Sequence, residues 1–228
     1  MIGFSVAGDI AGPLTVLCVG AHSDDIEIGC GATVLRLAAL GAQIRFHWVV
    51  LSAAGSRGEE ARKAAERFTS GAELNLHLAE FHDGYMSYNP GIKNYFEALK
   101  PKVQPDLIFT HRREDAHQDH RLVNQLTWNT YRNHAVFEYE IPKYDGDMGQ
   151  PNMFSPVMKE LAEKKVEILC DVFASQRSKS WFDREAFLGL MRIRGMESNS
   201  PSGLAEAFFA RKVVMSFSRE GASDVQHS

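Results

Sequence analysis

Residues 14–31 read LTVLCVGAHSDDIEIGCG, and this stretch decides the expected fold class. Its first seven residues are apolar at nearly every position, which is typical of a strand buried on both faces. A histidine and two adjacent aspartates follow directly, where unpaired charge is costly at the edge of a core. Residues 27–41 then show the apolar spacing of a helix. The stretch therefore predicts a strand-to-helix junction with His22, Asp24 and Asp25 at the carboxyl end of the strand.

The rest of the chain repeats this alternation of strand and helix patterns. Such spacing predicts βαβ units, and hence an α/β fold with a mostly parallel sheet and helices on both faces. The last third departs from the rhythm, with a loop over 144–156, a long helix over 157–176 and a mixed remainder. We expect one domain over residues 1–218, including this C-terminal helical and mixed extension, and a disordered tail over 219–228. The other expected strands are 44–52, 74–81, 106–111 and 136–142, and the other expected helices are 59–71, 92–100 and 120–134.

Composition and charge argue against several classes of protein. The net charge of −4 over 228 residues offers no basic surface for nucleic acid. The chain lacks an apolar run of about 18 residues, which argues against a membrane span, and its first residues lack the pattern of a signal peptide. The three cysteines form no CxxC pair. A disulfide framework is therefore not expected, and a reducing cytoplasm is the expected location.

A second polar cluster follows the strand expected over 106–111, within the sequence THRREDAHQDHR. In open α/β sheets, ligands bind beyond the carboxyl ends of the strands, so we expect both clusters to face one crevice. Two imidazoles and one carboxylate are a familiar catalytic zinc set that leaves a position for water. Residues three apart in each cluster can share one face of a helical turn, but this spacing does not identify the ligands. The second cluster contains His111, Asp115, His117, Asp119 and His120.

Each of these features also has a plainer interpretation. Asp24 or Asp25 could cap the helix that follows, and Asp119 could cap the helix expected at residue 120. A non-haem iron site uses the same ligand types as a zinc site. A nucleotide-binding module is a third possibility, but the first strand ends in GAHSDD and lacks the phosphate-cradling GxGxxG. The expectation for His47, His77 and His82 is a surface or core position.

The two clusters resemble the motifs of the LmbE-like, or PIG-L, family of zinc-dependent de-N-acetylases. The first family motif, Ala-His-Pro-Asp-Asp followed by Glu or Ile-Glu, stands here as AHSDDIE over 21–27. The second, His-x-Asp-His, stands as HQDH over 117–120, and SGLAEAFF over 202–209 is similar to the family's C-terminal segment. Ser23 replaces the usual proline, which removes a fixed φ from the turn. The resemblance implies a Rossmann-like fold.

The resemblance also implies a role for each motif residue. Asp24 is implied as the general base, His117 as the group that stabilises the oxyanion, and Asp119 as the residue that orients His117. One Zn²⁺ per chain is the implied cofactor, with Fe²⁺ or another divalent ion as the alternative. The implied metal ligands are His22, Asp25 and His120.

The implied reaction is hydrolysis of the acetamide of an N-acetylated amino sugar. The expected substrate is an N-acetylhexosamine, either free or linked to a nucleotide or lipid, and a metal-dependent amidase acting on a non-sugar amide is the alternative. The last third resembles a bacterial subgroup associated with surface-polysaccharide sugars, and a homo-oligomer is a further expectation. Arg57 could bind a substrate phosphate or pair with Glu59 or Glu60. Candidates for stacking on a sugar, each with packing as the plainer role, are Trp128, Tyr144 and Trp181.

Overall fold

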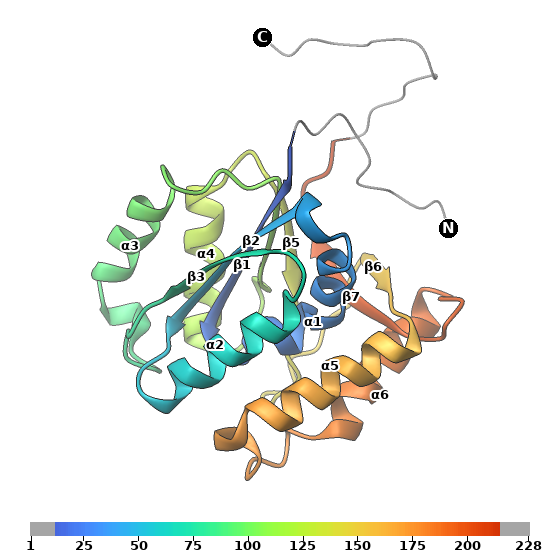
Figure 1. Cartoon of the computed structure of the whole chain (residues 1–228). Helices are drawn as coiled ribbons and strands as arrows, with labels where there is room; N and C mark the ends of the chain where they lie inside the picture. Colours follow the sequence, from blue (N-terminus) through green and yellow to red (C-terminus); the bar gives the residue numbers. More distant parts are fainter. Residues whose placement is uncertain (1–11, 215–228) are drawn as a thin grey trace, which may run out of the picture.

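A seven-stranded sheet runs through the computed structural model, which describes residues 12–214 (Figure 1). The strands are β1 (Leu14–His22), β2 (Ile44–Ser52), β3 (Glu73–Leu78), β4 (Leu107–His111), β5 (Ala135–Tyr139), β6 (Met153–Pro156) and β7 (Ala205–Ala210). The α-helices are α1 (Asp25–Ala38), α2 (Ser56–Phe68), α3 (Gly91–Leu99), α4 (Gln118–Thr130), α5 (Lys159–Val172) and α6 (Arg184–Glu197). Three short 3-10 helices are η1 (Gly41–Gln43), η2 (Met86–Tyr88) and η3 (Ala174–Gln176). The predicted tail over 219–228 lies outside the described residues.

The strand order in the sheet is β3-β2-β1-β4-β5-β7-β6. Strands β1 to β5 run parallel to one another, whereas β7 pairs antiparallel with both β5 and β6. The chain builds outward from β1 to β3 on one side and then returns to place β4 on the other side of β1. The predicted α/β class with a mostly parallel, Rossmann-like sheet is therefore confirmed. The return between β1 and β4 creates a switch point, where ligands bind in sheets of this kind.

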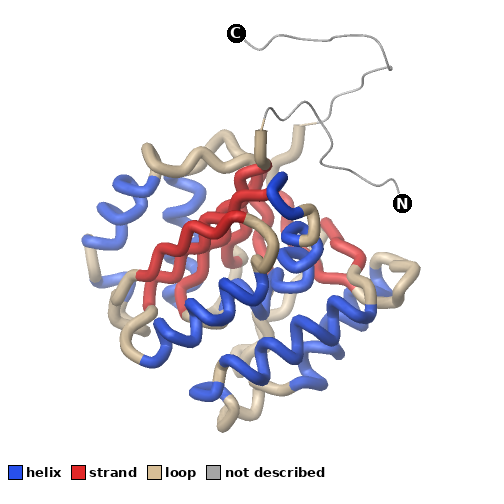
Figure 2. Tube along the Cα trace, viewed as in Figure 1, coloured by secondary structure: helices blue, strands red, loops and turns tan. Residues whose placement is uncertain are grey.

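Helices cover both faces of the sheet, because strand side chains alternate between two cores (Figure 2). In β1, Val16 and Cys18 join the core beneath α1, α2, α5 and α6, whereas Leu17 and Val19 join the core beneath α3 and α4. This double burial accounts for the nearly continuous apolar run of β1. Among residues 12–214, no helix is long and apolar enough to cross a membrane.

The C-terminal third differs from the sequence expectation in detail. Residues 144–156 were expected to be a loop, but β6 forms at their end and pairs with β7. β6 is a short, partly exposed edge strand that ends in a proline, so it lacks the periodic signal of a buried strand. The helix expected over 157–176 ends at residue 172, and α6 follows it as a separate helix.

Helix α1 begins two residues earlier than expected, at Asp25 instead of residue 27, and ends at Ala38. The strand before it is also longer than expected and includes His22. Only Ser23 and Asp24 therefore connect β1 to α1. This short connection places a histidine at the end of a strand and an aspartate in the first turn of a helix.

Candidate metal and catalytic site

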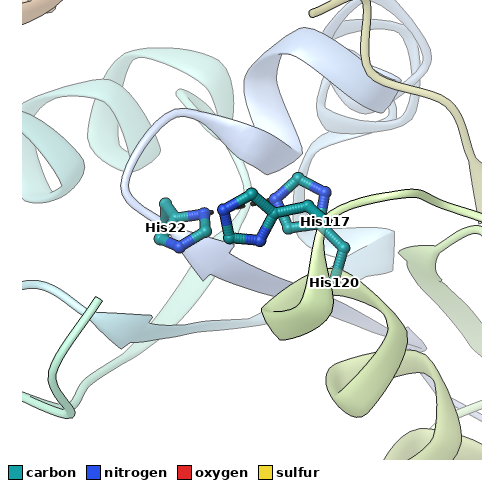
Figure 3. A group of neighbouring side chains, drawn as sticks. All are labelled: His22, His117 and His120. Carbon is teal, nitrogen blue, oxygen red and sulfur yellow. Dashed lines mark hydrogen bonds between the residues drawn. The ribbon is translucent and has the colours of Figure 1, made fainter. Parts of the chain in front are cut away.

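The two predicted clusters lie together at the carboxyl ends of β1 and β4, which are neighbours in the sheet. His22 is the last residue of β1, and Asp25 is the first residue of α1. His117 is the N-cap of α4, and His120 lies in the first turn of that helix. Figure 3 shows the three imidazole rings gathered between the end of the strand and the start of the helix. The two clusters therefore lie side by side, as the sequence predicts.

The three predicted metal ligands contact one another in pairs. His22 Nδ1 lies 3.2 Å from His120 Nε2 and 3.4 Å from Asp25 Oδ2. His120 Nε2 lies 3.5 Å from Asp25 Oδ1. Zinc bonds of about 2.0–2.1 Å in a tetrahedral site separate neighbouring ligand atoms by about 3.3 Å. Each pairwise distance is close to this value, with Asp25 facing His22 through Oδ2 and His120 through Oδ1. Three protein ligands would leave one position for another molecule.

Charge at the site favours a bound cation. Burial of the His22 ring opposes its protonation, but the carboxylates of Asp25, Asp119 and Asp83 outweigh burial and raise the pKa of His22 well above its ordinary value. Burial also works against an ionised Asp25, but His120, His111 and His22 lower the pKa of Asp25 well below its ordinary value. The same arrangement that stabilises a protonated imidazole stabilises a metal cation in place of the proton.

The described residues contain further donors around this triad. Three overlapping groups have donor atoms that all lie within 4.8 Å of one another: His22 with His117 and His120, His22 with Asp83, His117 and Asp119, and Asp25 with His111 and His120. The implied ligands are thus divided between two of these groups, which share His120. His111 Nε2 lies 3.1 Å from Asp25 Oδ2 and also accepts a hydrogen bond from the Ala21 N–H. Asp83 Oδ1 lies 3.0 Å from His22 Nε2.

Sequence analysis gave no role to two of these donors. His111 was noted in the second cluster, and its place as the last residue of β4 was the signal for its proximity to Asp25. Asp83 was not singled out at all. The Asp-Gly pair at 83–84, shortly after the carboxyl end of β3, was the available signal, because that strand end lies on the same edge of the sheet.

Asp24 is buried beside the metal ligands and holds one free oxygen. It occupies the N-cap position of α1, but its side chain makes no capping hydrogen bond. Arg57 Nη2 donates to Asp24 Oδ1 at 2.5 Å, whereas Oδ2 is buried without a hydrogen-bond partner among the described residues. Burial raises the pKa of Asp24, and the Arg57 guanidinium partly offsets this rise. A buried carboxylate oxygen without such a partner is available to a water or a ligand.

Arg57 lies in the first turn of α2 and is held by several partners. Besides Asp24, its guanidinium donates to Glu60 at 3.1 Å and to the Ser175 hydroxyl at 3.0 Å. The pairing with Glu60 is the plainer of its two expected roles. The carboxylate of Glu60 in turn accepts from the backbone N–H of Ser175. This network connects Asp24 to η3 through Arg57 and Glu60. Arg57, the candidate for substrate binding, is therefore hydrogen-bonded to Asp24, the candidate general base.

His117 and Asp119 do not pair through their side chains as the resemblance implied. The Asp119 backbone N–H donates to His117 Nδ1 at 3.2 Å, so the ring caps α4. The Asp119 carboxylate instead accepts from the Gly84 N–H at 2.7 Å and lies 3.4 Å from His22 Nε2. Burial and the neighbouring His120 and His22 lower the pKa of His117. Because Nδ1 accepts a hydrogen bond, a neutral His117 ring carries its proton on Nε2.

Asp115 supports the other histidine of this motif. Its Oδ2 lies 3.0 Å from His120 Nδ1, which leaves His120 Nε2 to face the metal position. Lys143 Nζ lies 3.1 Å from Asp115 Oδ1, and it also bonds the carboxylate of Asp147. Carboxylates that hold the second nitrogen of a metal-binding imidazole fix its tautomer and raise its basicity.

The remaining sequence candidates have other contacts. The Ser23 hydroxyl donates to the Ser52 carbonyl at 3.4 Å, so the residue that replaces proline ties the turn to the end of β2. Trp128 donates to Glu138 and packs against the guanidinium of Arg211. Tyr144 is 72 % exposed, and its hydroxyl accepts from Ser180. Stacking of a sugar on these rings, or on the partly buried Trp181, stays a prediction.

Comparisons with known proteins place both motifs inside one family match. A model of the PIG-L family, described as GlcNAc-PI de-N-acetylase, matches residues 17–131, which contain both motifs. The uncharacterized deacetylase YaiS of Escherichia coli (strain K12) is 29% identical over 164 residues, covering 68% of this chain and 88% of YaiS.

Solved structures show the same fold at lower identity. The 4-carboxy-2-hydroxymuconate hydratase GalB from Pseudomonas putida KT2440 has a TM-score of 0.73 at 18% identity, covering 90% of this chain and 99% of GalB. The N,N'-diacetylchitobiose deacetylase from Pyrococcus horikoshii has a TM-score of 0.68 at 16% identity, covering 85% of this chain and 82% of that one. The fold thus accommodates a hydratase as well as deacetylases, so the reaction has to be argued from the site.

Proposed function

The chain belongs to the PIG-L family, and from this premise we propose that it is a metal-dependent hydrolase that removes the acetyl group from an N-acetylated amino sugar. The observation that carries the proposal is a cluster of three residues whose donor atoms lie 3.2–3.5 Å apart in pairs, next to a buried carboxylate. His22, Asp25 and His120 would hold the metal. Asp24 beside them keeps one oxygen without a partner. A deacetylase needs both parts, because an acetamide is a poor electrophile and water is a poor nucleophile.

The metal would supply the electrophilic part of the chemistry. A zinc ion held by two imidazoles and a carboxylate lowers the pKa of a bound water to about 7 and polarises a carbonyl oxygen. One Zn²⁺ per chain is the proposed occupancy, and Fe²⁺ or another divalent ion is the alternative.

Asp24 would move the proton of the attacking water. Asp25 would be committed to the metal, whereas Asp24 Oδ2 has no partner among residues 12–214 and can accept a proton. Arg57 holds the other oxygen and keeps the carboxylate in one orientation. Attack forms the new C–O bond, the C–N bond then breaks, and the proton passes to the departing amine. The products are acetate and a free amino sugar.

His117 would stabilise the oxyanion that develops on the former carbonyl oxygen. Its Nδ1 accepts from a backbone N–H, so Nε2 carries a proton in both the neutral and the charged ring. Such a donor in comparable sites contributes roughly 3–4 kcal/mol to the transition state. Asp119 would act on His22 and on the loop at Gly84 instead of on the His117 ring.

Only similarity to other proteins indicates the substrate, so the substrate is proposed as a chemical class. Relatives with deacetylase names include YaiS and a chitobiose deacetylase, and the family is described by a sugar-lipid de-N-acetylase. We take an N-acetylhexosamine, free or carried by a nucleotide or lipid, as the substrate. An amidase that acts on a non-sugar amide would use the same residues.

Acetate release by zinc-loaded protein tests the proposal. The panel contains free, nucleotide-linked and lipid-linked N-acetylhexosamines together with simple non-sugar acetamides. Asp24→Asn should keep the bound zinc and lose most turnover, because it removes the base but no ligand. His120→Ala should lose zinc itself, as measured by metal analysis after gel filtration.

The outcomes separate the parts of the proposal. Wild-type turnover that survives in Asp24→Asn would remove the base assignment, and full zinc occupancy in His120→Ala would remove that ligand. Release from non-sugar acetamides alone would redirect the substrate class. No acetate from any compound, by protein that retains zinc, would argue against the deacetylase reaction.

A further inference from the structure

Helix α1, which carries Asp25 in its first turn, is broken in the middle. Cys30 has φ −141° and ψ 17°, outside helical values, and it divides the helix into two segments. The first segment carries the proposed ligand, and the second packs in the core. A break of this kind frees backbone C=O groups at the end of the first segment and N–H groups at the start of the second. Such groups need partners when they are buried.

A buried ion pair fills this break. Lys165 of α5 donates to the Ile28 carbonyl at 2.6 Å and to Glu206 of β7 at 2.7 Å. The Glu206 carboxylate accepts from the Ala32 N–H at 2.8 Å and from the Thr33 N–H at 2.7 Å. The two side chains are only 3% and 2% exposed. The lysine thus completes the end of the first segment, and the glutamate caps the start of the second.

The charges match the ends of the two segments. A cation stabilises the carboxyl end of a helix and an anion stabilises the amino end. A buried ion pair is weak evidence for stability, because burial costs as much as the pairing contributes. Its placement between two helix segments therefore indicates a role in geometry more than in net stability.

The surroundings restrict how the break can move. A Cβ atom on Gly29 would lie 2.3 Å from the Tyr139 ring, and one on Gly31 would lie 2.6 Å from the Phe68 ring. The glycines on either side of Cys30 therefore let the broken helix pack directly against β5 and α2. With these contacts on the sides and the ion pair at the ends, the first segment has one defined direction relative to the second.

We propose that Lys165 and Glu206 are positioning residues for the metal site, which hold the broken α1 so that Asp24 and Asp25 face the metal. This inference rests on the proposed function in taking Asp25 as a metal ligand. It gives a role to Glu206 of the AEAF segment at 205–208, which lies outside the family match over 17–131. Lys165 lies outside that match as well.

The test compares Glu206→Gln with a matched control, Glu140→Gln. Glu140 is 5% exposed and forms a buried two-bond pair with Arg194, at 2.6 and 2.8 Å, but it bonds α6 instead of the break in α1. Zinc affinity is measured by competition with a chromogenic chelator, on samples matched for folded fraction. We expect Glu206→Gln to bind zinc about ten- to hundredfold more weakly. Glu140→Gln should lose comparable stability and keep wild-type zinc affinity.

Hydrogen exchange provides a readout for the geometry itself. The amides of Ala32 and Thr33 should exchange faster in Glu206→Gln than in the control. If Glu206→Gln does not fold, Glu206→Asp replaces it, because the shorter carboxylate keeps the charge but cannot reach both amides. In that variant we expect faster exchange at Ala32 or Thr33 together with weaker zinc binding.

The failure of this inference can be distinguished from failure of the proposed function. If Asp25→Asn loses zinc but the Glu206 variants keep wild-type zinc affinity, the positioning role of Glu206 is overturned, whether or not amide exchange is faster. Equal losses of zinc affinity in Glu140→Gln and Glu206→Gln overturn it too. A wild-type chain that binds no zinc, or binds it independently of Asp25, overturns the proposed function and this inference together.

Discussion

Replacement of Arg57 by methionine should shift the pH dependence of the reaction. The Arg57 guanidinium bonds Asp24 at 2.5 Å, and the carboxylate is 5% exposed. Burial raises the pKa of Asp24, and Arg57 opposes that rise. Asp24 accepts a proton only when it is ionised, so activity falls as the pH falls through its pKa. Removal of Arg57 therefore moves this acidic limb of the profile to higher pH.

The size of the effect follows from the burial of the pair. The Arg57 side chain is 24% exposed, so solvent screens the interaction only partly. A charge-assisted hydrogen bond to such a group is worth about 1.5–3 kcal/mol, and 1.36 kcal/mol is a factor of ten. We therefore expect the acidic limb of kcat/KM to move to higher pH by about one to two units in Arg57→Met, which is a ten- to hundredfold loss at pH values on that limb. At high pH, where Asp24 is ionised in both proteins, the difference should shrink.

The assay is acetate release from the best N-acetylated sugar between pH 5.5 and 9.5. Arg57→Lys keeps a positive charge and should restore part of the acidic limb. Arg67→Met, on the same helix but paired with Asp171 at the surface, is the control that should leave the profile unchanged. An acidic limb that does not move in Arg57→Met would refute the role of Arg57 on Asp24. A raised KM for phosphorylated sugars, with the limb in place, would support the substrate-phosphate role instead.

Three further perturbations test the site and its surroundings. Lys143→Met should weaken zinc binding about tenfold, because Lys143 contacts the carboxylate that holds His120. The control is Lys93→Met, which removes an exposed ion pair within a helix and should leave zinc affinity unchanged. Equal zinc affinities of the two variants in chelator competition would contradict the role of Lys143. Removal of the metal with a chelator should abolish acetate release and lower Tm, because zinc at about 1,000 times its Kd stabilises the folded chain by about 4 kcal/mol. An unchanged Tm in a thermal scan would argue against the metal site. Burial raises the pKa of Glu27 well above its ordinary value of 4.5, so the folded chain holds a proton that the unfolded chain releases, and stability falls as pH rises above 4.5. Glu27→Gln should therefore raise the free energy of unfolding more at pH 8 than at pH 4 in urea titrations, and a pH-independent effect would contradict the buried, unpaired state of that carboxyl.

Local sequence patterns predicted most of the strands and helices. The apolar runs of β1, β2 and β4 marked buried strands because a parallel strand packs on both faces, and their amphipathic partners marked the helices. The sequence patterns did not predict β6, because a partly exposed edge strand needs no apolar pattern. Helix bounds shifted by a few residues, since the ends of helices depend on contacts that sequence periodicity does not encode.

The site divides in the same way. The sequence indicated most of the side chains that could bind a metal, though not Asp83, and it placed them after strands whose carboxyl ends share one edge of a sheet. Only the tertiary structure decided which groups hold them: Arg57 on Asp24, Lys143 on Asp115, and Lys165 with Glu206 in the break of α1. The physical reason is the separation of the partners along the sequence. Motif spacing reports neighbours within one turn or strand end, whereas these ion pairs join residues 28 to 41 positions apart, and only packing brings such groups together.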